Sequence, residues 1–398
     1  MHQMLMTKMT TPVLFASLLA GCHLGGDTPL DQPTTANQVG MTDGPAGGSS
    51  GNPAEGLGSG GSATVSGKSN ISCDVTEFAV PTDSSSPAGL TVGADGNLWF
   101  TESAAGKIGR ITPTGMITEY IVPNSFSLLA ITAGPDGNLW FTDEAGWIGR
   151  ITPDGTITEF PVTTTGAGTP RGITTGPDGN LWFTDSSGRI GRMTTAGKID
   201  EFSLPSASRD SIANSTENPM TITTGPDGNL WFTEFEGTNI GRITAKGVIT
   251  EFALGTFRNP NGIVAGPDGN LWFTEFYGLD GVEHIGRITP KGTIAEFPIP
   301  TLNSNPNDIV AVPDGNLWFV ESSGNKLAYV TTSGTIVECP PLVPAPLGYP
   351  SGIVVGTDGN LWFTESASNK IGHTNPSGGN TPPMDGSTTQ PSSDASAD

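Results

Sequence analysis

The stretch GITTGPDGNLWFTD at residues 172–185 is one of seven similar copies in this chain of 398 residues. Successive copies of its hexapeptide DGNLWF lie 41 to 49 residues apart, which is the period of a four-stranded propeller blade. A repeat of this length predicts seven blades arranged in a ring. The hexapeptides begin at Asp95, Asp136, Asp178, Asp227, Asp268, Asp314 and Asp358.

Each copy divides into four short segments that we predict to be β-strands. In the third copy these segments are residues 172–176, 181–184, 190–193 and 199–202. β-Branched and aromatic residues fill the segments, while Gly, Asn and Asp fill the turns between them. We therefore expect an all-β fold over residues 71–376, a seven-bladed β-propeller with four antiparallel strands per blade.

The order of the segments predicts how the ring closes. A segment of the outer-strand type, residues 75–81, precedes the first hexapeptide. The last copy, residues 353–373, has no outer strand after it. The N-terminal strand should therefore complete the last blade, which leaves no free strand edge at the seam.

The composition excludes several other classes of protein. The 56 Gly and 33 Pro residues argue against a helical bundle. With 17 Lys and Arg against 39 Asp and Glu, the net charge is −22, so we expect a monomer with no nucleic-acid partner. Three cysteines are too few for a disulfide-built scaffold, and whether Cys73 and Cys339, on outer strands of neighbouring blades, form a disulfide stays open.

The N-terminal residues 1–22 have the features of an export signal. Their apolar stretch is too short to span a bilayer. The segment ends in Leu-Ala-Gly-Cys, which resembles the bacterial lipoprotein signal acylated at Cys22; an ordinary cleaved signal is the alternative. Residues 23–70 are rich in Gly, Ser and Pro and should form a flexible tether, and residues 377–398 a disordered tail. We expect an exported lipoprotein anchored in the membrane, at the outer membrane or cell surface.

One face of the predicted ring varies far more than the other, and we call it the top face. The turns of the opposite face repeat almost unchanged from blade to blade. Recognition belongs on the variable face of such a scaffold. The innermost strand starts there, so the residue before its Gly-Ile pair, the mouth position, should line the opening of the channel. The mouth positions hold Ala88, Leu129, Arg171, Met220, Asn261, Asn307 and Ser351.

An acidic residue ends the second predicted strand of every blade, at the same face. These strand-end acids could bind a divalent cation or a basic group, or they could serve the blade itself. Arginines recur on the adjacent strand as candidate partners, and the tryptophan of each hexapeptide should pack between blades. The strand-end acids are Glu102, Asp143, Asp185, Glu234, Glu275, Glu321 and Glu365, and the arginines are Arg110, Arg150, Arg192, Arg242 and Arg287.

The repeated phrase GITxGPDGNLWFTE, followed by IGRITPxGxITEF, is similar to that of the virginiamycin B lyase (streptogramin lyase) family over residues 71–376. The resemblance implies a seven-bladed propeller that opens a lactone ring with the help of Mg²⁺. It also implies histidines acting as base or acid at the mouth positions of blades six and seven. A tyrosine is implied at the first mouth position, and two Mg²⁺-binding glutamates in blade seven.

This chain departs from the family pattern at most of the implied positions. Ala88 stands in place of the tyrosine, Asn307 and Ser351 in place of the histidines, and Tyr349 in place of the first glutamate. Only Glu365 matches, which makes it the candidate metal ligand. Asn and Ser do not by themselves supply the base near neutral pKa that an elimination needs. Of the four histidines, we expect His284 alone on the top face.

Two hypotheses follow for the top face. The first is a tethered module that binds a small molecule, peptide or glycan, with Arg171 either holding a ligand carboxylate or sulfate or neutralising the acids. Its binding residues would be Arg171, Asn261, Asn307, Tyr349 and Ser351, with Glu234, Glu275 and Glu365 beneath. The alternative is a Mg²⁺-dependent lyase with a rearranged site made of Glu275, His284 and Glu365. The missing histidines favour the binding module.

Overall fold

We describe the protein from a computed structural model of the chain. The proposed signal, tether and tail (residues 1–22, 23–70 and 377–398) lie outside the described residues. No helix long and apolar enough to cross a membrane occurs in the part that is described. That part comprises residues 73–162, 168–205, 218–255, 258–276, 281–342 and 348–376.

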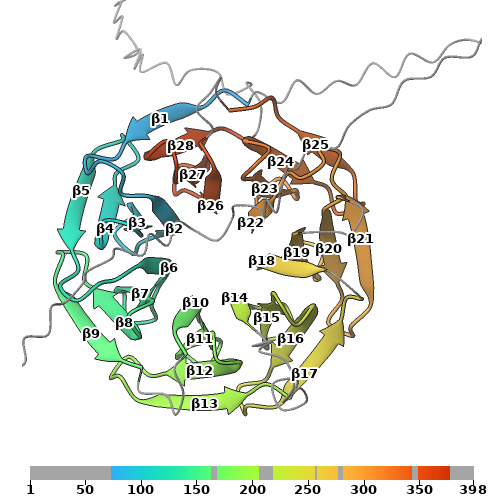
Figure 1. Cartoon of the computed structure of the whole chain (residues 1–398), viewed down its shortest axis with the longest axis horizontal. Coiled ribbons are helices and arrows are strands. Elements are labelled where there is room, and N and C mark those ends of the chain that lie inside the picture. Colours follow the sequence, from blue (N-terminus) through green and yellow to red (C-terminus); the bar gives the residue numbers. More distant parts are fainter. Residues whose placement is uncertain are drawn as a thin grey trace, which may run out of the picture. The chain divides into compact units, whose positions relative to one another are not determined.

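The described residues form seven antiparallel sheets of four strands each, which confirms the predicted seven-bladed propeller (Figure 1). The innermost strands are β2 (Pro87–Val92), β6 (Leu128–Ala133), β10 (Pro170–Thr175), β14 (Pro219–Thr224), β18 (Asn259–Ala265), β22 (Pro306–Ala311) and β26 (Pro350–Val355). The second strands are β3 (Leu98–Glu102), β7 (Leu139–Asp143), β11 (Leu181–Asp185), β15 (Leu230–Glu234), β19 (Leu271–Phe276), β23 (Leu317–Glu321) and β27 (Leu361–Glu365).

The outer half of each blade consists of a third strand and an outer strand. The third strands are β4 (Lys107–Ile111), β8 (Trp147–Ile151), β12 (Arg189–Met193), β16 (Asn239–Ile243), β20 (His284–Ile288), β24 (Lys326–Val330) and β28 (Lys370–Thr374). The outer strands are β5 (Ile117–Ile121), β9 (Ile157–Pro161), β13 (Ile199–Ser203), β17 (Ile249–Ala253), β21 (Ile294–Pro298), β25 (Ile336–Glu338) and β1 (Thr76–Ala79).

The ring closes as the order of segments predicts. Strand β1 pairs antiparallel with β28, with Phe78 opposite Ile371, and so completes the blade of β26, β27 and β28. Innermost strand β2 contacts both β6 and β26, so the first and last blades are neighbours (Figure 1). The first and last strands of the propeller therefore meet within one sheet.

The repeated hexapeptide builds a turn that holds a tryptophan in place. In the third blade, the Oδ1 atom of Asp178 accepts hydrogen bonds from the backbone N–H of Asn180 (3.2 Å) and from Nε1 of Trp182 (3.0 Å). Gly179 between them has a φ of +73°, a left-handed conformation that favours glycine. The Asp, Gly and Asn of the motif are thus explained by the geometry of the turn.

The tryptophans pack between blades, as expected. Trp182 is fully buried and belongs to one cluster with Ile222 and Phe232 of the next blade. On the other face of the same sheet, the ring of Phe183 lies where a Cβ on Gly191 would be, at 2.0 Å. This close approach explains the glycine of the recurring Ile-Gly-Arg motif.

The recurring arginines do not pair with the strand-end acids, so that expectation is wrong. In the antiparallel register Arg192 lies opposite Trp182, whereas Asp185 lies opposite Arg189 at the other end of the strand. The guanidinium of Arg192 lies over the Trp182 ring, 5.6 Å from its centroid, and donates to the carbonyl of Ala245 in the next blade (3.0 Å). Arg110, Arg242 and Arg287 also donate to a carbonyl of the next blade at the face opposite the top, whereas Arg150 donates to Thr158 of its own blade.

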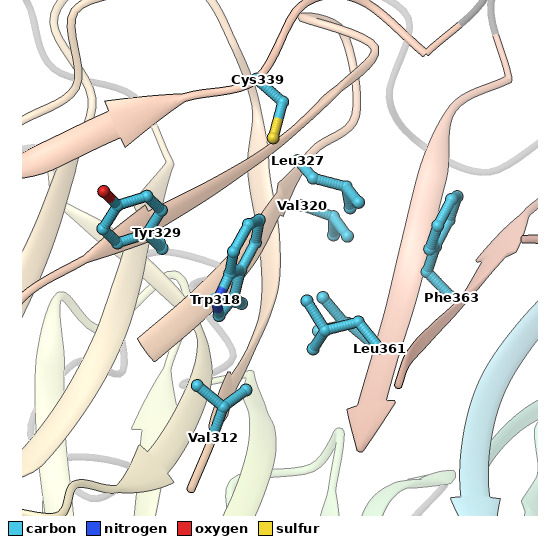
Figure 2. Packing of buried hydrophobic residues seen from close by; sticks show 9 residues of the cluster. Val312, Trp318, Val320, Leu327, Tyr329, Cys339, Leu361 and Phe363 are labelled. Atoms are coloured by element: carbon cyan, nitrogen blue, oxygen red, sulfur yellow. The ribbon is translucent and has the colours of Figure 1, made fainter. Parts of the chain in front are cut away.

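The two cysteines left open by the sequence form a disulfide. Cys73 precedes β1 and bonds to Cys339, which directly follows β25, with a Cα–Cα distance of 5.9 Å. Figure 2 shows Cys339 in the hydrophobic cluster that also contains Trp318, Val320 and Leu327. The disulfide therefore joins the closing strand of blade seven to the core of blade six.

Candidate functional site

The seven mouth positions lie where each innermost strand is irregular. In every blade the pairing with the second strand shifts register over these residues, as between Pro170 and Ile173 in the third blade. Such a bulge re-aims a side chain away from the sheet. All seven mouth side chains are half-buried, so they are neither packed in the core nor fully exposed. They form the candidate site.

A threonine on the second strand fixes this geometry in six blades. The hydroxyl of Thr184 accepts a hydrogen bond from the backbone N–H of Gly172 (2.9 Å) and donates to the carbonyl of Met220 in the next blade (2.8 Å). The hydroxyl therefore links the mouth positions of two adjacent blades. The corresponding residues are Thr101, Thr142, Thr184, Thr233, Thr274 and Thr364, and blade six has Val320 instead.

The structure pairs two predicted binding residues with each other and gives Arg171 and Ser351 partners outside the predicted set. Asn261 donates from Nδ2 to Oδ1 of Asn307 in the next blade, at 2.8 Å. An Nη1 of Arg171 contacts the Met220 sulfur at 3.7 Å, again between adjacent blades. Ser351 hydrogen-bonds to Thr364 of its own blade at 3.0 Å. Amide and hydroxyl groups therefore line the mouth on blades five, six and seven.

Sequence reasoning missed Asp308, which directly follows the mouth residue of blade six. Its Oδ1 accepts from the N–H of Ile309 (2.9 Å) and its Oδ2 from the N–H of Ile353 in blade seven (3.1 Å). Removal of the carboxyl from water raises its pKa to about 6. A signal was available, because the same position elsewhere holds only small residues: Gly89, Ala130, Gly172, Thr221, Gly262 and Gly352.

The strand-end acids, including the predicted Glu234, Glu275 and Glu365, lie inside the blades. All seven are fully buried, and each lies opposite the first or second residue of its innermost strand. Asp143, for example, accepts backbone N–H bonds from Phe126 (3.2 Å) and Ala145 (2.8 Å). Among the described residues, no three His, Cys, Asp or Glu side chains are grouped in a way that could hold a metal ion.

Burial keeps several of these acids protonated near neutral pH. Desolvation, reinforced by the nearby Glu338 carboxylate, raises the pKa of Glu321 to about 8 against the opposing effect of Lys326. Burial likewise raises the pKa of Glu102 to about 7 and that of Glu275 to about 8. These acids therefore act as buried polar groups of the blade more than as a ring of charges.

We predict that Glu321→Gln protects the protein against alkaline destabilisation. A carboxyl whose pKa is raised on folding contributes stability below its unfolded pKa, near 4.5, and that stability is lost as the pH rises toward 8. The variant should gain about 2 to 4 kcal/mol relative to wild type between pH 5 and pH 8. Urea unfolding at both pH values measures this, with the exposed Glu236→Gln as control. Parallel curves for all three proteins would contradict it.

Glu365 and Tyr349, the predicted pair of blade seven, have different surroundings. Burial raises the pKa of Glu365, which accepts a hydrogen bond from the Ser368 hydroxyl. Tyr349 is 37% exposed and has a φ of +49°, in the left-handed region. One side chain is thus enclosed within the blade while the other is presented to solvent on the top face.

His284 and Glu275, the other predicted pair, are register partners in blade five. Arg258 contacts both, with Nη1 2.7 Å from Nδ1 of His284 and Nε 3.8 Å from Oε2 of Glu275. Because a guanidinium only donates, Nδ1 of His284 accepts this bond. Arg258 also pairs with Glu296 at 3.2 Å. The histidine thus belongs to an ion-pair network at the blade edge, away from the mouth positions.

Known proteins resemble this chain in both sequence and fold. Residues 61–215 and 207–382 match the virginiamycin B lyase family. The chain belongs to this family. A streptogramin B lyase structure is 37% identical, covers 75% of this chain and 96% of its own, and superposes with a TM-score of 0.68.

A second virginiamycin B lyase structure, from Staphylococcus aureus, is a catalytically inactive histidine-to-alanine variant with quinupristin. It is 39% identical, covers 75% of this chain and 98% of its own, and has a TM-score of 0.68. The virginiamycin B lyase of Bacillus licheniformis is 46% identical over 43 residues, which span 11% of this chain and 15% of that protein. The two solved structures therefore match this chain over the propeller, whereas the match to the Bacillus licheniformis protein has the length of about one repeat.

Proposed function

We propose that this member of the virginiamycin B lyase family is an exported, membrane-tethered module that binds a ligand at the mouth without opening a lactone ring. The observation that carries the proposal is the set of side chains at the mouth, where Ala88, Asn307 and Ser351 provide no group that titrates near neutral pH. The related Staphylococcus aureus enzyme is catalytically inactive when one histidine is replaced by alanine. The same dependence in this chain would leave it without that histidine.

The mouth is suited to binding. Its backbone is fixed by bulges and by threonine bridges between blades, so its side chains are held in place before a ligand arrives. Asn261 and Asn307 offer both donors and acceptors beyond their mutual bond, and Arg171 offers a positive charge. A rigid, polar, half-buried surface of this kind selects a ligand by hydrogen bonds and charge.

The alternative, a Mg²⁺-dependent lyase, finds less support in the side chains present. Mg²⁺ is bound through carboxylate oxygens and keeps several waters. Glu365 is enclosed and its pKa is raised, and the phenol of Tyr349 stands where the resemblance implies a second carboxylate. Glu275 is enclosed as well, and His284 accepts a hydrogen bond from Arg258. These groups do not fit the ion, and no base among them faces the mouth.

A thermal-shift screen tests the binding proposal. The mature chain (residues 22–398) carrying Cys22→Ser would be heated with peptides, glycans and streptogramin-type lactones, each with and without Mg²⁺. We expect at least one class to raise the Tm without Mg²⁺, and Arg171→Ala or Asn307→Ala to remove that shift. Shifts that appear only with Mg²⁺, or that both variants retain, would contradict binding at the mouth.

Export and tethering rest on the N-terminal sequence and on the disulfide. Disulfides persist in oxidising compartments outside the cytoplasm, so the Cys73–Cys339 pair supports export. A lipid on Cys22 followed by the tether of residues 23–70 would hold the propeller away from the membrane as a monomer. The net charge of −22 is unfavourable for nucleic acid, so the ligand we propose is a small molecule, peptide or glycan.

We predict that membrane association depends on Cys22. Cys22→Ser removes the sulfur that would be acylated, so the protein should move from the membrane fraction to the soluble fraction and lose labelling by a fatty-acid probe. Fractionation and metabolic labelling in a bacterial host measure both effects, with Cys339→Ser as a control that leaves the signal intact. A Cys22→Ser protein that stays with membranes and still takes up label would refute the anchor.

A further inference from the structure

Two charged groups at the mouth have no counter-charge within the described part of the chain. Arg171 makes no ion pair there: its Nε is buried without a hydrogen-bond partner, and an Nη1 contacts only the Met220 sulfur, at 3.7 Å. Sulfur is a weak acceptor, and a guanidinium has five donors to satisfy. A cation held this way at a half-buried position is prepared for an anionic partner.

Asp308 is the anionic counterpart. Each of its carboxylate oxygens accepts one backbone N–H, from Ile309 and from Ile353, and no Lys, Arg or His lies within ion-pair distance among the described residues. A carboxylate has about four acceptor sites, so these two bonds leave capacity for a donor from a ligand. A half-buried charge without a counter-charge is costly to the fold.

A purely structural role does not require the charge. Blade six lacks the bridging threonine, because Val320 replaces it, and the bond from Asp308 to the Ile353 N–H supplies a link to blade seven instead. A neutral side-chain carbonyl could accept that bond as well. Ser322 donates a further bond to the carbonyl of Pro350 in blade seven (2.6 Å). The negative charge itself therefore remains unexplained by the link between blades.

The strands that carry the two charges lie on opposite sides of the ring. Strand β10, which carries Arg171, and strand β22, which carries Asp308, are separated by β14 and β18 on one side and by β26, β2 and β6 on the other (Figure 1). The hydrogen-bonded amides of Asn261 and Asn307 lie on the shorter arc between them. The mouth thus offers a positive end, a negative end and amide groups along one side.

We propose that the mouth binds a zwitterion, a short linear peptide with free ends, with its terminal carboxylate on Arg171 and its terminal ammonium on Asp308. An arginine holds a carboxylate through two parallel hydrogen bonds, and a carboxylate accepts from an ammonium. The amides of Asn261 and Asn307 match the donors and acceptors of a peptide group. This proposal rests on the binding function proposed above and names the ligand class for the same site.

Calorimetric titration of the mature chain carrying Cys22→Ser, with alanine and with di-, tri- and tetra-alanine, tests it directly. We expect one peptide length to bind best, because the two charges are carried by different strands of a closed ring. N-Acetylation or C-amidation of that peptide should each weaken binding by at least about 30-fold. Equal affinity for free and capped peptides, or no binding at any length, would overturn the proposal.

Two variants assign each end of the peptide. Asp308→Asn should weaken binding and abolish the penalty for N-acetylation while the penalty for C-amidation remains. Arg171→Gln should do the reverse. Asp154→Asn and Lys291→Gln, exposed charges in the turns of the opposite face, are the matched controls and should leave affinity within about twofold. If both variants lost the penalty for the same cap, the assignment of the two ends would be overturned. The Tm of each variant reports whether it is folded.

The outcomes separate this proposal from the one on which it rests. A glycan or lactone could raise the Tm in a way that Arg171→Ala removes, while capped and free peptides bind with equal affinity. That result would overturn the zwitterionic ligand and keep the proposal that the mouth binds a ligand. Efficient lactone opening by the purified protein would overturn the binding module itself. Tighter binding of a zwitterionic phosphocholine than of any peptide would also overturn the peptide assignment.

Discussion

Deleting residues 71–81 is expected to lower the Tm by roughly 10 °C or more and to broaden the transition. The deletion removes β1, whose residues pair with β28, together with the buried Val80 and Cys73 of the disulfide. It also removes Phe78, which stacks on Trp362 at 5.8 Å, and so opens the core between blades seven and one. Phe78 is partly buried against this core, and the exposed edge of β28 adds a risk of aggregation.

Deletion of residues 377–398 is the matched control for this truncation. That segment follows the last strand of the propeller, so its removal should leave the Tm within about 2 °C of the intact protein. Calorimetry of the two truncated proteins and of the intact chain measures the difference. Equal melting temperatures for the two truncations would refute closure of the ring by the N-terminal strand.

Removing the Cys73–Cys339 disulfide is expected to have the second largest effect, a loss of about 3–5 kcal/mol of unfolding free energy. The bridge spans 266 residues of sequence, so it constrains nearly the whole unfolded propeller. It also anchors the segment before β1 to the adjacent blade. Strand β1 itself is held to β28 by only four paired residues. A double Cys73→Ser, Cys339→Ser protein should therefore unfold at lower denaturant concentration than wild type.

The reducing agent dithiothreitol provides the control for that pair of substitutions. It should lower the stability of wild type toward that of the double variant and leave the double variant unchanged. Urea unfolding under both conditions measures this. A wild type that is equally stable with and without reductant, while its cysteines are shown to be reduced, would contradict the stabilising role.

The sequence predicts the fold because the same local rules repeat seven times. The turn at Asp178 and the burial of Trp182 are local consequences of the hexapeptide, and the missing outer strand after residue 373 implies the seam. The register within a blade is harder to predict. Arg192 and Asp185 are on adjacent strands, yet the antiparallel pairing places them at opposite ends, so proximity in the repeat suggested a partnership that the structure does not have.

The site was harder to predict than the fold, because its properties depend on packing between blades. Glu321 ends a strand and is fully buried, which the strand pattern alone does not predict. Asp308 accepts from Ile353, a residue 45 positions away in the next blade, so the role of its carboxylate is visible only in three dimensions. The disulfide is similar, since the repeat places Cys73 and Cys339 on neighbouring blades but does not give the distance between them.

Incubation of the purified mature chain with a streptogramin B antibiotic and Mg²⁺, followed by chromatography of the ring-opened product, tests the central claim most directly. A streptogramin lyase serves as the positive control. Since no mouth position of this chain holds a histidine, we expect no product above the enzyme-free rate. Mg²⁺-dependent ring opening that is lost in Glu365→Gln or in His284→Ala would contradict the account and establish this chain as an active lyase.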